Sequence, residues 1–209
     1  MFGAKQDWTA EQRKLLESTM PVTMPRTMGT WTPGAFDTAE GVEAITATWR
    51  DMVRGVFKQD GKLNFIGFIF CTRDPRGISD HVVLSTKAQN RHDEVAKEAL
   101  AKVVRLTASI GKAAATITVF EAWMCHAKTE DYASVEKWRS EHNNSIEGHP
   151  DTFETALMLV ETHAGCMMHL AKIHRAPDGK RTMGEWEPPF SGGSGRFIGL
   201  LKPENWEAS

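Results

Sequence analysis

Two glutamates lie where alternating strand patterns would otherwise place apolar side chains. Glu121 falls in segment 114–125, which is rich in β-branched residues, and Glu161 falls in segment 153–163. Successive side chains of a strand point to opposite faces, so each carboxylate would share its face with large apolar residues. If the two strands are neighbours, the carboxylates could face each other. They would then repel, with one pKa raised, or share a cation.

Two residues of the polar loop between these strands extend the pair to a candidate metal site. His149 and Asp151 supply an imidazole and a carboxylate, which together with Glu121 and Glu161 suit a divalent metal. This set predicts a metal-dependent hydrolase, in which Glu121 and Glu161 are the catalytic candidates. The strong signatures are missing from the sequence, because there is no HExxH motif and no nucleophile elbow.

A structural interpretation competes with the metal site, and we favour it. One glutamate would pair with an arginine across the sheet, such as Arg175 or Arg181, and the histidines would be solvated loop groups. Cys166 and His163 would be neighbours at a hairpin, but nothing polar orients the imidazole. We therefore expect no cysteine nucleophile.

The composition is that of a globular protein. Of 209 residues, 41% are apolar and 25% are charged, and the formal net charge is −2. No run of five basic residues occurs, so we expect no nucleic-acid partner. The longest apolar run, 65–71, is far below the ~20 residues of a membrane span, and no signal peptide is evident. The widely spaced Cys71, Cys125 and Cys166 indicate buried thiols in a reducing, cytoplasmic compartment.

The hydrophobic pattern predicts the elements that would position these residues. Apolar residues recur at three- and four-residue steps in 37–57 and in 91–110, which predicts two amphipathic helices. Strands are expected at 63–72, 81–85, 114–125, 153–163, 166–175 and 180–187, with a short helix at 134–141 and a turn at Ala164-Gly165. We predict an α+β fold: an antiparallel sheet of about five strands, two helices on one face, and the order α-β-β-α-β-β-β.

Irregular arms flank this core domain, which we assign to 37–187. The N-terminal arm, 1–36, begins with a short helix and continues as proline-rich extended chain that we expect to pack along its own domain or a neighbouring subunit. The tail, 188–209, begins as a Gly/Ser linker and leads to an apolar segment, 197–201, that adds an edge strand or docks elsewhere. Trp8, Trp31 and Trp206 lie in the arms, where exposed aromatics indicate contact with another surface.

Three segments carry a resemblance. The residues 121–124 (EAWM), 149–151 (HPD) followed by Glu154, and 157–161 (LMLVE) resemble a pattern in hypothetical proteins of bacteria and their phages. The resemblance covers only part of the chain and implies no activity, cofactor or catalytic role. It implies a bacterial or phage origin.

These observations lead to three hypotheses of function. The first is a non-enzymatic assembly or protein-interaction module without a cofactor, which forms homo-oligomers or docks on other proteins. A phage-encoded structural or accessory protein, in the host cytoplasm or the virion, would be one such module. The second is the hydrolase with a divalent metal. The third is a small-molecule binder that uses the sheet face beside Trp123.

Overall fold

A computed structural model of the chain describes residues 26–32, 34–71, 79–85, 94–125, 132–142, 145–191 and 197–201. The elements are β1 (Arg26–Trp31), α2 (Ala39–Asp60), β2 (Ile66–Cys71), β3 (Ser79–Ser85), α3 (Glu94–Gly111), β4 (Ala113–Cys125), α4 (Tyr132–Glu141), β5 (Thr152–Thr162), β6 (Gly165–Arg175), β7 (Arg181–Trp186) and β8 (Phe190–Ser191). The predicted α+β class and the order of the main elements are confirmed.

All strands join one antiparallel sheet, in the order β1-β3-β2-β4-β5-β6-β7, with β8 also paired to β6. The strands β4 to β7 are neighbours in space in the same order as in the sequence. The strand β1 pairs with β3, so this part of the N-terminal arm packs along its own domain and extends the sheet beyond 37–187. The sheet has eight described strands where about five were predicted, because β1 and β8 also join it.

The helix α2 is bounded by the signals expected of its sequence. The Thr38 side chain accepts a hydrogen bond from the Gly41 N–H (3.1 Å), which caps the first turn. Gly61, with φ 66°, ends the helix and donates its N–H to Phe57 O (2.8 Å). The ring of Trp49 stacks on Phe68 of β2 with 3.8 Å between centroids. No described helix is long and apolar enough to cross a membrane.

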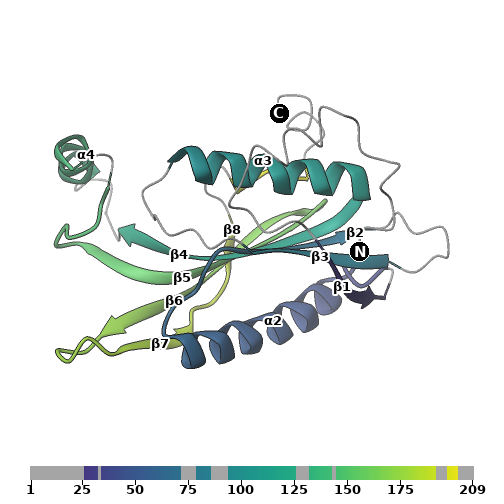
Figure 1. Cartoon of the computed structure of the whole chain (residues 1–209), viewed down its shortest axis with the longest axis horizontal. Helices are drawn as coiled ribbons and strands as arrows, with labels where there is room; N and C mark the ends of the chain where they lie inside the picture. Colours follow the sequence, from purple (N-terminus) through teal and green to yellow (C-terminus); the bar gives the residue numbers. More distant parts are fainter. Residues whose placement is uncertain are drawn as a thin grey trace.

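The two long helices cover opposite faces of the sheet (Figure 1). Residues of α2 pack with one set of strand side chains, which includes Ile117 and Met158, whereas α3 packs with the other set, which includes Ile69 and Leu159. The prediction that both helices lie on one face is therefore wrong. The physical reason is that β5 is buried at every position from 154 to 161, so both of its faces need a cover.

The hairpin between β5 and β6 turns one residue earlier than predicted. Thr162 pairs with Gly165, so His163 and Ala164 form the turn instead of Ala164 and Gly165. This register places Glu161 beside Cys166 on the neighbouring strand. The short helix α4 lies beyond the ends of β4 and β5 (Figure 1).

Candidate functional site

The structure separates the two glutamates that the sequence suggested as a pair. Glu121 of β4 lies opposite Ala156 of β5, whereas Glu161 of β5 lies opposite Thr116 of β4. Directly opposite residues share a face of the sheet. Since Thr116 and Glu121 are an odd number of positions apart, the two carboxylates lie on opposite faces, Glu121 on the α2 side and Glu161 on the α3 side.

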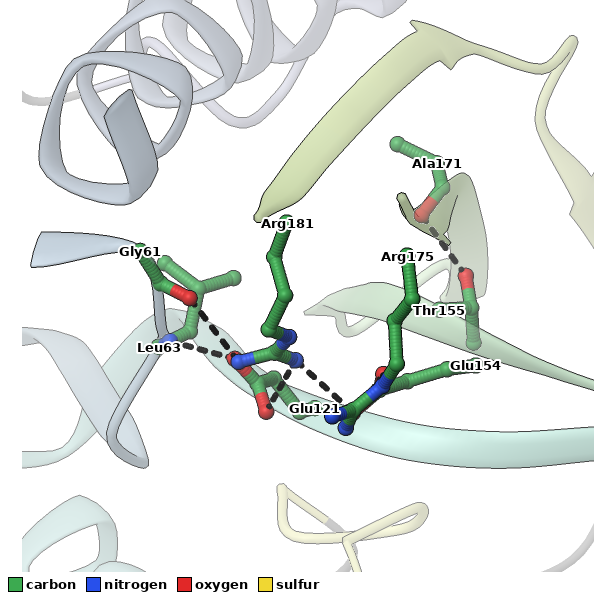
Figure 2. A network of polar contacts seen from close by, with 8 residues as sticks. All are labelled: Gly61, Leu63, Glu121, Glu154, Thr155, Ala171, Arg175 and Arg181. Carbon is green, nitrogen blue, oxygen red and sulfur yellow. Dashed lines mark hydrogen bonds and ion pairs between the residues drawn. The ribbon is translucent and has the colours of Figure 1, made fainter. Parts of the chain in front are cut away.

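On the α2 side, Glu121 belongs to a buried ion network centred on Arg181 (Figure 2). The Nη2 atom of Arg181 lies 2.9 Å from Oε2 of Glu121 and 2.7 Å from Oε1 of Glu154. Its Nη1 donates to Gly61 O at 2.8 Å, and the Leu63 N–H donates to Oε1 of Glu121 at 2.7 Å. The network joins the end of α2 to β4, β5 and β7.

The second carboxylate of the network, Glu154, was not among our sequence candidates. Only 3% of its side chain is exposed, and it also accepts two hydrogen bonds from Arg175, whose side chain is half exposed. Glu154 shares the α2-side face of β5 with Ala156 and Met158, so the same alternation that singled out Glu121 would have found it. Two acids and two arginines balance the local charge, as the structural interpretation predicts.

On the α3 side, Glu161 holds a segment of the chain through its backbone. Its Oε2 accepts from the Leu200 N–H at 2.9 Å and its Oε1 from the Leu201 N–H at 3.0 Å. Glu161 is only 4% exposed, and no Lys or Arg of the described residues forms an ion pair with it. A buried carboxylate is costly without such donors, so the two N–H groups stabilise its charge.

His149 and Asp151 lie together, away from both glutamates, in the loop after α4. The His149 ring is buried against Trp138, with 5.4 Å between the ring centroids, and its Nδ1 lies 3.9 Å from Oδ2 of Asp151. Its Nε2 lies 3.2 Å from Oγ of Ser134 in α4. The residues Ser134, His149 and Asp151 thus have the spatial order of a serine-hydrolase triad, which the sequence did not reveal.

The hydrogen bonds of this trio oppose triad chemistry. The backbone N–H of Asp151 donates to Nδ1 of His149 at 3.2 Å. The proton of a neutral imidazole then resides on Nε2, which donates it to Ser134 Oγ. A triad needs the reverse arrangement, in which Nε2 accepts the serine proton and Nδ1–H donates to the carboxylate. The trio therefore fixes α4 to its loop.

The other candidates from the sequence are the metal ligands, Cys166 and the tryptophans of the arms. Among the described residues, no three His, Cys, Asp or Glu side chains are grouped so as to hold a metal ion. The pKa of Cys166 is raised to about 11, mainly by burial and also by the charge of Glu161, so its thiolate is scarce near neutral pH. Trp8 and Trp206 lie outside the described residues, and of Trp31 only the backbone, in β1, is described.

One buried histidine stands apart from all these groups. His169 on β6 has no exposed surface, and neither ring nitrogen has a hydrogen-bond partner among the described residues. Its pKa is lowered to about 4, mainly by burial and also by the positive charge of Arg50 on α2, against the opposing charge of Glu43. The ring is therefore neutral at physiological pH and packs as part of the α2-side core.

Comparisons with protein-family models, with curated proteins and with solved structures found no match to this chain.

Proposed function

We propose that the protein is a non-enzymatic assembly module, which associates through the open edge of its sheet. The observation that carries the proposal is the position of β1, a strand of the N-terminal arm that lies at the end of the sheet and pairs only with β3 among the described strands. The outer edge of such a strand offers backbone N–H and C=O groups to a strand of another chain.

The opposite edge is less suited to this role. There β7 and β8 are separated by Glu187-Pro188-Pro189, whereas β1 itself contains no proline. The register shifts at both edges, between Ala171 and Ile173 in the pairing of β6 with β7 and between Thr27 and Gly29 in the pairing of β1 with β3. Proline is a usual protection of an edge against pairing, so the two edges differ in proline and not in the register shift. The contrast between the two edges favours association through β1, the strand that ends at Trp31.

The ion pairs and hydrogen bonds of the acidic candidates favour the assembly function over the hydrolase. Glu121 and Glu154 neutralise the largely buried Arg181, and Glu161 accepts two backbone hydrogen bonds. A carboxylate held in this way has little freedom to bind a catalytic metal or to move a proton in a reaction. A cytoplasmic setting, bacterial or in a phage-infected host, is part of the proposal and fits the absence of a disulfide among Cys71, Cys125 and Cys166.

Hydrogen exchange measured at several protein concentrations tests the proposal. If two copies pair through β1, amide exchange in residues 26–31 slows as the concentration rises, while the mass from light scattering increases. The amides of β5, in the middle of the sheet, are the internal control and exchange at the same rate throughout. Exchange of 26–31 that is independent of concentration from the micromolar to the millimolar range contradicts the proposal.

A further inference from the structure

The segment Phe197–Leu201 fills an apolar groove on the α3 side of the sheet. Phe197 is 8% exposed, and Leu200 and Leu201 are 0% and 2% exposed. The Phe197 ring lies 4.8 Å from that of Phe65 and 5.2 Å from that of Phe120, measured between centroids. The segment therefore completes a core that α3 and the strands leave open.

The floor of this groove recognises the backbone of the segment. Gly199 has φ 75°, a conformation that favours glycine, and the two N–H groups that follow it both point to the Glu161 carboxylate. Each carboxylate oxygen accepts one of them. The groove therefore binds a short peptide segment in two ways: it buries the apolar side chains, and its buried carboxylate accepts hydrogen bonds from two consecutive N–H groups.

The connection to this segment lies outside the described part of the chain. Strand β8 ends at Ser191, and the five residues 192–196 that follow are GGSGR. Five residues reach at most about 18 Å. Exchange of an identical element between two copies keeps every contact of the groove and makes a dimer.

We propose that this groove also accepts the segment Phe197–Leu201 of a second copy, which yields a segment-exchanged dimer. The inference rests on the proposed assembly role, but it uses a different surface from the β1 edge. In the closed monomer the tethered segment is present at a millimolar effective concentration, so the wild-type chain exchanges only at comparable protein concentrations.

The length of the tether tests the exchange without changing the groove or the segment. In one variant Gly192, Gly193 and Ser194 are deleted, which shortens the connection from five residues to two and opposes closure within one chain. In the matched control the same three residues are duplicated. We expect the shortened chain to dimerise with a dissociation constant at least about tenfold lower than that of the wild type, and the lengthened chain to remain closed.

The thiol of Cys166 reports whether the groove is filled, because it packs against the same cluster as Leu200. In the exchanged dimer its alkylation stays as slow as in the wild type. A shortened chain that remains a folded monomer overturns the exchange, and so does a dimer in which Cys166 reacts quickly.

A complementation experiment tests the same contact with two full-length variants. Glu161→Leu disables the groove and Leu200→Asp disables the segment, so neither variant alone can exchange symmetrically. Their mixture should form a one-to-one heterodimer, detected by native mass spectrometry, at least about tenfold more abundant than either homodimer. Absence of the heterodimer from a mixture of folded variants overturns the proposal. If either variant fails to fold, the comparison of the shortened and lengthened chains tests the exchange instead.

The outcomes separate this inference from the proposed function. If the shortened, wild-type and lengthened chains associate with the same dissociation constant, the exchange is overturned. Concentration-dependent protection of residues 26–31 would still support the assembly role. Loss of that protection together with tether-dependent dimers would contradict edge pairing and support the exchange.

Discussion

The guanidinium of Arg181 lies 2.7 Å from the carboxylate of Glu154, and both groups are largely removed from solvent, with 12% and 3% of their side chains exposed. The same guanidinium also binds Glu121 and the carbonyl oxygen of Gly61. One cation therefore stabilises two buried acids and the end of a helix at once. Its removal has consequences at all three places.

We expect Arg181→Met to destabilise the fold by about 3–5 kcal/mol, because it leaves two buried carboxylates with less compensation. Arg175→Met is the matched control, since Arg175 binds Glu154 but is half exposed, and it should cost ~1 kcal/mol or less. Urea unfolding monitored by circular dichroism measures both free energies. Equal losses in the two variants would refute the central role of Arg181.

The buried His169 predicts a dependence of stability on pH. Its pKa is about 4 in the folded chain against an ordinary 6.5, so the unfolded chain binds the proton first as the pH falls. The contribution to stability is complete above about pH 6.5 and is lost between pH 6.5 and pH 4, on the order of 3 kcal/mol at about 1.4 kcal/mol per pH unit.

His169→Leu should remove this dependence and leave stability at pH 7 unchanged or slightly higher, because the ring nitrogens have no described hydrogen-bond partner. His174→Leu, an exposed position on the same strand, is the control and should keep the slope. The measurement is the free energy of unfolding of each chain from pH 7 to pH 4. Parallel curves for the wild type and His169→Leu would contradict the assignment.

Alanine substitutions at two glycines should change the stability of the fold in opposite directions. A methyl group at Gly111 would overlap Sγ of Cys71 and lie 2.9 Å from its Cβ, so Gly111→Ala should destabilise by about 1–3 kcal/mol. Gly55 in α2 has nothing within 4 Å of the same position, and Gly55→Ala should stabilise by about 0.5–1 kcal/mol through helix propensity. Thermal melting of both variants measures the difference. A tolerated alanine at 111 would show that α3 is not fixed against β2.

The tautomer of His149 predicts an inert Ser134. Because Nε2 carries the proton, the imidazole cannot activate the hydroxyl, and a fluorophosphonate probe should not label the folded chain above the level seen in Ser134→Ala. Mass spectrometry of the labelled protein gives the result. Stoichiometric labelling at Ser134 would instead support an acyl-transfer enzyme and contradict the proposed function.

Local patterns predicted the elements well, because their signals are carried by neighbouring residues. The helix α2 follows from apolar residues at helical spacing in 37–57, and it continues to Asp60 before Gly61 ends it. Alternation placed Glu121 among apolar side chains, and the expected partner Arg181 is confirmed. The tertiary choices were less accessible. An amphipathic helix shows which of its faces is buried but not which face of a doubly apolar sheet it covers, and the contact of Glu161 with Leu201 joins residues 40 apart in the chain.

The two cores of the sheet become complete at different stages of synthesis. The α2-side cluster draws its members from residues up to Trp186, whereas the α3-side cluster also needs Phe197, Leu200 and Leu201. During synthesis the α2-side core can therefore form before Phe65 and the Glu161 carboxylate have gained their contacts with residues 197–201. The α3 side therefore gains its full set of contacts only after these last residues have been made.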